Sequence, residues 1–136
     1  MTLSPQQEEQ LVRAAREVRR NAYAPYSHFQ VGAAVMGEDG RIYTGCNVEN
    51  AVYGATLCAE RVAVGQAVAA GQRRLVAAAV VADSRTPTTP CGTCRQVLSE
   101  FGGDMVVIVD NGQRRWRFTL GQLLPEAFSK EQLSGK

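Results

Sequence analysis

Leu75-Val76-Ala77-Ala78-Ala79-Val80-Val81-Ala82 is an unbroken apolar run, and it is the strongest indication of fold class in this chain. A short apolar run of this kind is typical of a strand that is buried on both faces of a sheet. Residues 105–110 (MVVIVD) form a second run of the same type. Because strands buried on both faces need covering helices on both sides, the sequence favours an α/β fold.

The segments around these two runs predict helices and further strands. Ser4-Pro5, followed by Gln7, favours a helix start, and apolar residues at helical spacing extend this helix for about five turns. The other predicted elements are strands 29–36, 41–46 and 115–118 and helices 58–70, 91–101 and 120–124. The order α-β-β-α-β-α-β-β-α predicts a three-layer α/β/α sandwich with a mixed five-stranded sheet, formed by a single domain of residues 1–136.

The composition narrows the classes of function. The chain has 15 basic and 13 acidic side chains, and the net charge of +2 gives no reason to expect a nucleic-acid partner. The first residues lack the pattern of a secretory signal, and no apolar run approaches the ~18 residues of a membrane helix. We therefore expect a cytoplasmic protein without a membrane partner. Its four cysteines are expected to be reduced there, which favours metal or redox chemistry over disulfides.

Two short motifs predict a zinc site. They are Cys58-Ala59-Glu60 and Pro90-Cys91-Gly92-Thr93-Cys94, each at the expected start of a helix. A C-x-x-C pair alone is equally compatible with thioredoxin-like redox chemistry. A third cysteine with a carboxylate two residues later favours hydrolytic zinc instead, because three protein ligands leave the fourth position open to water. Cys46 and His28 are less favoured as a fourth, closing ligand.

The spacing and charge of these motifs give two further expectations. Cys58 and Glu60 share a pocket only if Cys58 lies at the very start of its helix, because residues i and i+2 of a helix point apart. Three thiolates and one Zn²⁺ carry a charge of about −1, which a nearby cation would offset. Arg61 is the favoured candidate for contact with the thiolates, whereas Arg95 is an even alternative.

The chain resembles the short, homotetrameric cytidine deaminases over residues 10–130. The resemblance rests on residues 23–33 (YAPYSHFQVGA), 45–51 (GCNVENA), 58–61 (CAER), 90–96 (PCGTCRQ) and 124–128 (LPEAF). It implies one zinc ion per subunit, held by Cys58, Cys91 and Cys94, with Glu60 as the catalytic acid and base. It also implies that Asn47 and Glu49 bind the ribose 3′-hydroxyl, and that Phe29 and the backbone of Ala59 contact the nucleoside. Three further residues would reach the active site of a neighbouring subunit: Ala51, Tyr53 and Phe128.

The function that this resemblance implies is the conversion of cytidine and 2′-deoxycytidine to uridine and 2′-deoxyuridine, with release of ammonia, in pyrimidine salvage. A carboxylate at the 3′-oxygen would repel the phosphate of a polynucleotide, so Glu49 favours a free nucleoside, although loop polarity and capping also explain Asn47 and Glu49. The alternatives are a related deaminase that acts on blasticidin S or on a base in RNA, and a non-enzymatic zinc module with four protein ligands.

Overall fold

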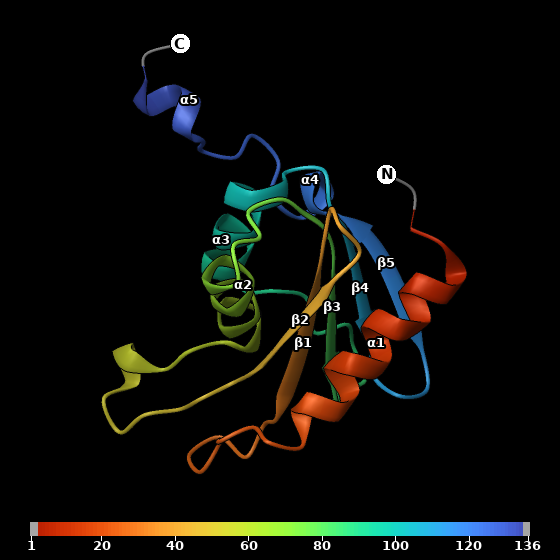
Figure 1. Ribbon diagram of the computed structural model, residues 1–136. Helices are drawn as coiled ribbons and strands as arrows, with labels where there is room; N and C mark the ends of the chain where they lie inside the picture. The colour runs from red at the N-terminus through yellow and green to blue at the C-terminus, as the bar shows by residue number, and fades with distance from the viewer. Residues whose placement is uncertain (1–2, 135–136) are drawn as a thin grey trace.

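A computed structural model describes residues 3–134, and its centre is a mixed five-stranded sheet with the strand order β2-β1-β3-β4-β5 (Figure 1). The strands are β1 (Val31–Gly37), β2 (Ile42–Cys46), β3 (Leu75–Ala82), β4 (Val106–Asp110) and β5 (Arg115–Thr119). β3 and β4 are parallel, and the other neighbouring pairs are antiparallel. The predicted mixed five-stranded sheet is confirmed.

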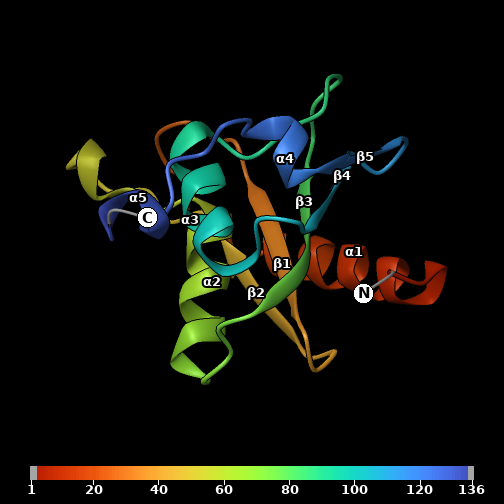
Figure 2. The same ribbon diagram turned by 90° about the horizontal axis from the view of Figure 1, so that it is seen from above.

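Helices cover both faces of the sheet (Figures 1 and 2). α1 (Pro5–Arg19) packs on one face, where Leu11 and Val12 meet Ile108 of β4. α2 (Ala59–Ala69) and α3 (Gly92–Gly102) lie on the other face, in the second core cluster. The three-layer α/β/α sandwich predicted from the sequence is therefore correct.

β3 contributes buried residues to the core on both faces of the sheet. Its residues contribute to both core clusters, with Ala78 on the α2–α3 side and Ala77 and Ala79 on the α1 side. Apart from half-buried Val76, all of its residues are buried. This burial explains why the sequence shows a continuous apolar run in place of an alternating pattern.

The predicted first helix is slightly too long. α1 begins at Pro5, where Ser4 and Gln7 form the expected capping box, but it ends at Arg19 after 15 residues, about four turns. Beyond its end the backbone becomes extended, because Tyr23 forms a parallel β-bridge with Val48, in which Tyr23 N donates to Asn47 O and Glu49 N donates to Tyr23 O. This pairing draws the chain toward the loop that follows β2 and ends the helix early.

Several other boundaries differ by one or two residues. The strand predicted at 29–36 begins at Val31, because the peptide groups of Phe29 are bonded to side chains of the surrounding loops. α2 and α3 each begin one residue later than predicted, after Cys58 and Cys91. The last predicted helix is α4 (Leu120–Leu123), while η1 (Tyr53–Ala55) and α5 (Lys130–Leu133) were not predicted. No helix within residues 3–134 combines the length and apolarity needed to cross a bilayer.

Candidate metal centre and active site

The three predicted metal ligands lie at the N-terminal ends of two neighbouring helices. Cys58 is the cap residue of α2, Cys91 is the cap residue of α3, and Cys94 lies in the first turn of α3. The structure therefore places Cys58 at the very start of its helix, as the spacing to Glu60 required. Helix N-termini carry a partial positive charge, which favours the thiolate form that binds metal.

The sulfur atoms of these cysteines form a cluster that matches one zinc ion. All three Sγ atoms lie within 4.8 Å of one another, and those of Cys58 and Cys91 are 3.9 Å apart. A tetrahedral zinc with Zn–S bonds of about 2.3 Å places its sulfurs about 3.8 Å apart. Among residues 3–134 this is the one group of three or more His, Cys, Asp or Glu side chains at ligand spacing, and Cys46 and His28 lie outside it.

The thiols of Cys58 and Cys94 shift each other's pKa in opposite directions. A hydrogen bond from Cys94, supported by Arg61, lowers the pKa of Cys58 to about 5. The same hydrogen bond, together with burial, raises the pKa of Cys94. A divalent cation bound by the three sulfurs would displace the thiol protons, since each ligand binds as a thiolate.

Arg61 is the arginine that reaches the cluster. Its Nη2 lies 3.8 Å from the Sγ of Cys58 and donates to the carbonyl oxygen of Thr56 at 3.0 Å. Arg95 points elsewhere, because its guanidinium donates to Pro90 O, Leu123 O and Thr89 Oγ1. Arg95 therefore does not contact the thiolates, which was the alternative left open by the sequence. Its guanidinium instead holds the loop before Cys91 against the end of α4.

Glu60 lies in the first turn of α2 and lines the same cavity as Cys58 and Cys91. Only 6% of the residue is exposed. Burial raises the pKa of its carboxyl to about 7; its own backbone N–H opposes the shift and the negative charge of Cys58 adds to it. A carboxyl with a pKa near neutrality is well matched to accept and return a proton at physiological pH.

A cavity of about 290 Å³ opens over Cys58, Glu60 and Cys91. Four of the predicted substrate residues line it, namely Phe29, Asn47, Glu49 and Ala59. The sequence reasoning missed further lining residues, Ser27, Val31, Thr56, Leu57, Thr88 and Thr89. Ser27 lies within the 23–33 motif and the threonines precede Pro90, but nothing in their residue type indicated a role.

The three residues expected at a neighbouring subunit's site are not in this cavity. Ala51 and Tyr53 lie on or beside the exposed η1 turn, and 77% of Tyr53 is exposed. Phe128 lies in the C-terminal segment between α4 and α5, with 56% of the residue exposed, and its carbonyl oxygen accepts a hydrogen bond from Gln96. Within a single chain these side chains therefore do not join the metal ligands.

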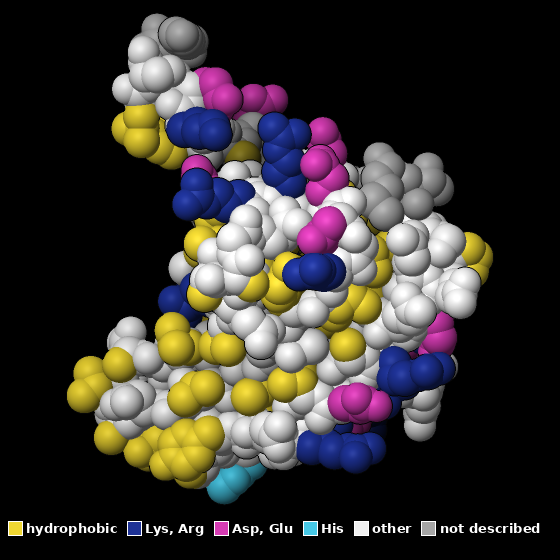
Figure 3. All heavy atoms as spheres, viewed as in Figure 1, with side chains coloured by type: hydrophobic (Ala, Val, Ile, Leu, Met, Phe, Trp, Pro, Cys, Tyr) yellow, Lys and Arg dark blue, Asp and Glu magenta, His cyan; other side chains and the backbone are white. Residues whose placement is uncertain are grey.

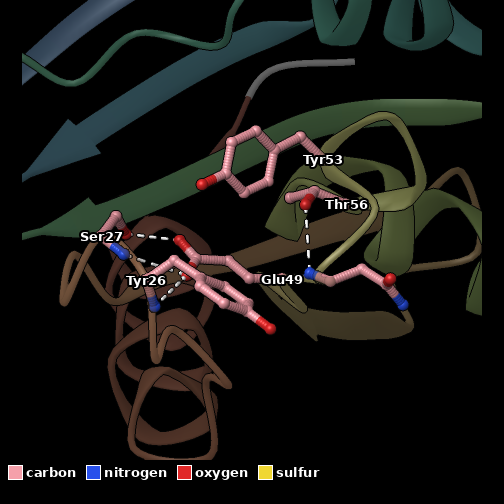
Figure 4. A pocket seen from close by; sticks show the side chains of 6 residues that line it. Tyr26, Ser27, Glu49, Tyr53 and Thr56 are labelled. Carbon is pink, nitrogen blue, oxygen red and sulfur yellow. Dashed lines mark hydrogen bonds between the residues drawn. The ribbon is translucent and has the colours of Figure 1, made fainter.

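Asn47 and Glu49 are held by the backbone of the loop before β1. The amide of Asn47 accepts from Val31 N at 2.9 Å and donates to Phe29 O at 2.8 Å. The Oε1 atom of Glu49 accepts from the backbone N–H groups of Tyr26 and Ser27 at 2.9 and 3.1 Å (Figure 4). An amide and a carboxylate have more donor and acceptor positions than these bonds use, so both side chains keep capacity for a ligand.

The Glu49 carboxyl also accepts from the hydroxyl of Ser27. This hydrogen bond is the largest of the influences that hold the pKa of Glu49 below its usual value, and the backbone N–H groups of Ser27 and Tyr26 add to it. Glu49 is therefore an anion at neutral pH. The cavity thus contains one carboxyl suited to proton transfer and one that stays charged.

Comparison with known proteins agrees with this arrangement. Residues 5–110 match the family model of the cytidine and deoxycytidylate deaminase zinc-binding region. A cytidine deaminase of Sporosarcina psychrophila is 51% identical over 128 residues, which cover 93% of this chain and 94% of that protein. A cytidine deaminase of Mycobacterium tuberculosis is 49% identical over 119 residues, or 88% of this chain and 87% of that protein.

A solved structure shows the same fold. The crystal structure of a cytidine deaminase from Burkholderia pseudomallei superposes with a TM-score of 0.85 and 46% sequence identity, and the match covers 94% of this chain and 100% of that chain. The family match spans the three cysteines, whose sulfurs already fit one zinc ion. The chain therefore belongs to the family of zinc-binding cytidine and deoxycytidylate deaminases.

Proposed function

We propose that this enzyme hydrolyses the 4-amino group of cytidine and 2′-deoxycytidine, giving uridine or 2′-deoxyuridine and ammonia. The observation that carries the proposal is the position of Glu60, a buried carboxyl that lines the same cavity as Cys58 and Cys91 of the three-thiol cluster. The cytidine deaminases that share up to 51% of their residues with the chain support this choice of substrate.

Glu60 moves the protons in the proposed reaction. Cys58, Cys91 and Cys94 would hold a zinc ion, whose Lewis acidity would lower the pKa of a water molecule. The Glu60 carboxylate accepts a proton from that water and delivers it to N3 of the ring, while the oxygen of the water adds to C4 and forms the new C4–O bond. Glu60 then moves the proton of the C4 hydroxyl to the 4-amino group; the C4–N bond breaks, ammonia leaves and C4=O forms, so that cytidine and water give uridine and ammonia. Arg61 offsets the negative charge of the three thiolates.

The lining of the cavity favours a free nucleoside. Asn47 and Glu49 bind the 3′-hydroxyl of the sugar, Phe29 packs against the nucleoside, and the backbone of Ala59 holds the base. The lining contains the carboxyls of Glu49 and Glu60, and among the described residues no lysine or arginine lines it. A 3′-phosphate would lie beside the Glu49 anion without a compensating cation, which disfavours nucleic acid.

The active sites are proposed to be shared within a homotetramer. Exposed apolar side chains gather on the loops around η1, namely Tyr23, Tyr26, Val48, Val52 and Tyr53 (Figure 3). A large exposed apolar patch is typical of a protein interface. In this arrangement Ala51, Tyr53 and Phe128 complete a neighbouring subunit's site, and Phe128 stacks on the pyrimidine.

We further propose that residues 1–136 act as one catalytic domain, in the cytoplasm, in pyrimidine salvage. Reduced thiols are required for the zinc site, and the cytoplasm keeps thiols reduced. A non-enzymatic zinc module is disfavoured because only three ligands cluster within the described residues, whereas structural sites use four.

A substrate panel tests the proposal directly. The zinc-loaded protein is incubated with cytidine, 2′-deoxycytidine, blasticidin S, adenosine, guanine and short RNA and DNA oligonucleotides, and ammonia release is measured. We expect ammonia from the first two compounds. Ammonia only from blasticidin S or from an oligonucleotide would identify a related deaminase on the same scaffold, and would contradict the proposed substrate.

A further inference from the structure

We infer that Ser27 is a positioning residue of this active site, which fixes the Glu49 carboxylate in the orientation that receives the sugar 3′-hydroxyl. The inference rests on the proposed function, since it assumes that Glu49 binds the sugar. Ser27 lines both the metal cavity and the adjoining hollow of Tyr26, Asn50 and Tyr53 (Figure 4).

The hydroxyl of Ser27 is held in one orientation by two partners. Its oxygen accepts a hydrogen bond from Phe29 N at 3.0 Å, and its proton is donated to the Oε2 atom of Glu49. A serine hydroxyl has one proton, so the bond from Phe29 leaves that proton free to point at the carboxylate. Ser27 is therefore an oriented donor, although it lies at the protein surface.

The carboxylate is then fixed at both oxygens. Oε1 accepts from the N–H groups of Tyr26 and Ser27, and Oε2 accepts from the Ser27 hydroxyl. Three of the roughly four acceptor positions of a carboxylate are thus used, and the remaining one is on Oε2. Without the hydroxyl, the carboxylate is held through Oε1 alone, and Oε2 is less restricted because the terminal torsion of glutamate is broad.

A bend of the backbone at His28 brings Phe29 N close to the Ser27 hydroxyl. His28 has a φ of 59°, a left-handed conformation that non-glycine residues adopt rarely. The bend is closed by a hydrogen bond from His28 N to Ala24 O at 2.9 Å. With this bend, Phe29 N donates to the Ser27 hydroxyl, while Phe29 O separately accepts a hydrogen bond from the Asn47 amide. Such strained backbone persists where surrounding contacts determine it, and it is concentrated at functional sites.

This arrangement predicts that Ser27→Ala lowers kcat/KM only for substrates that carry a 3′-hydroxyl. In Ser27→Ala the Phe29 carbonyl keeps its bond to Asn47 and Oε1 of Glu49 keeps its two backbone donors, so the loop is retained while Oε2 of Glu49 loses its donor. We expect kcat/KM for cytidine to fall about tenfold, mainly through KM, because the lost bond is to a charged group. For 2′,3′-dideoxycytidine, which has no 3′-hydroxyl, kcat/KM should stay within about twofold of the wild-type value.

Three comparisons complete the kinetic experiment. Ser27→Thr keeps a hydroxyl and should recover most of the cytidine activity. In a Glu49→Gln background, the Ser27→Ala change should alter kcat/KM by less than about twofold, because residues that act through one another are not additive. Ser134→Ala is the control, since Ser134 is exposed and also makes one side-chain hydrogen bond, to Glu131 O at 2.9 Å.

A titration of Glu49 tests the contact without turnover. We expect the pKa of its carboxyl, followed by NMR, to be higher in Ser27→Ala than in the wild type, because the largest influence that lowers it has been removed. An unchanged pKa, or equal losses of activity with cytidine and 2′,3′-dideoxycytidine, would overturn the inference. A wild-type protein that deaminates neither nucleoside would instead overturn the proposed function, and the titration would still decide whether Ser27 holds Glu49.

Discussion

Two glutamates line the same cavity, and their surroundings give them opposite properties. Burial makes the Glu60 carboxyl a proton carrier with a pKa of about 7. Hydrogen bonds from Ser27 and neighbouring N–H groups keep Glu49 ionised. Glu60 is therefore suited to acid–base chemistry and Glu49 to binding because their solvation and hydrogen bonding differ, although both are glutamates.

Replacement of Glu60 by glutamine removes the proton carrier and leaves the three sulfur ligands in place. We expect turnover of cytidine to fall by at least 10²–10⁴-fold, while zinc content stays at one ion per chain. Steady-state rates and metal analysis of the same sample measure both quantities. Glu17→Gln, an exposed position on α1, is the matched control. Turnover within tenfold of the wild type would rule out Glu60 as the acid and base.

At the scale of elements, the position of α2 decides where Glu60 lies, and β2 sets that position. Gly45 of β2 packs directly against the backbone of α2: a Cβ atom there would lie 2.4 Å from Ala63 N and 2.5 Å from Ala59 O. Gly45 therefore allows a close approach of strand and helix. Because α2 packs over β2 and β1 and beside α3, this approach helps to set where its first turn, with Glu60, lies.

Gly45→Ala is expected to force α2 away from the sheet. We predict a loss of about 2–3 kcal/mol of unfolding free energy, because backbone atoms have little freedom to move aside, and a fall in kcat as Glu60 is displaced. Denaturant unfolding at fixed zinc content measures the first effect. Gly103→Ala is the control, since Gly103 has a φ of −57° and no atom within 4 Å of an added Cβ. Equal stability of the two variants would contradict this role of Gly45.

A second connection between elements joins α1 to β4 and β5. Asp110, at the end of β4, accepts from Arg16 of α1 at 2.8 Å and from Arg115 of β5 at 2.9 Å. Burial of Asp110 opposes its ionisation, but Arg115, the N–H of Gly112 and Arg16 outweigh this effect and hold its pKa below the usual range. The ionised carboxylate therefore stabilises the folded state.

The stability gained from Asp110 should depend on pH in one direction. Because its pKa is lower in the folded than in the unfolded chain, the contribution is present above the unfolded pKa of about 4 and is lost as the pH falls through the folded pKa. We expect Asp110→Asn to lose about 2 kcal/mol near pH 7 and to approach the wild type in acid. Thermal unfolding from pH 7 to pH 2 checks this, with exposed Asp83→Asn as control. A difference that grows in acid would contradict it.

At the scale of the whole molecule, the single chain leaves Phe128 away from the metal cavity. If the sites are shared, an inactive Glu60→Gln subunit still donates a normal Phe128 to its neighbour. Mixing it with a Phe128→Ala subunit, through reversible unfolding and reassembly with zinc, should therefore create some complete sites. We predict that the mixture exceeds the summed activity of the two separate variants. Activity equal to that sum would contradict sharing of sites.

Most of the architecture could be predicted from the sequence. The apolar run of β3 indicated a strand buried on both faces, and the Ser4 capping box fixed the start of α1. The spacing of Cys58 and Glu60 predicted that a helix begins just after the cysteine, as α2 does. These features are local, so residue types and their spacing are sufficient to reveal them.

The features that could not be predicted depend on contacts between distant segments. Tyr23 ends α1 early because it pairs with Val48, and Arg95 turns away from the thiolates because Leu123 supplies an acceptor. Ser27 contacts Glu49, a residue 22 positions away. No local pattern encodes such partners. The substrate residues themselves were inferred from resemblance to a family, and four of them line the cavity.

A zinc titration of the metal-free protein, with uridine formation from cytidine as the readout, tests whether zinc at the three cysteines is required for deamination. We expect no uridine without metal and a rate that rises linearly until one zinc ion is bound per chain. Cys46→Ser should follow the same line, since Cys46 lies outside the cluster, whereas Cys91→Ser should lose zinc and activity together. Uridine formation by the metal-free protein, or none at full zinc occupancy, would contradict a zinc-dependent cytidine deaminase.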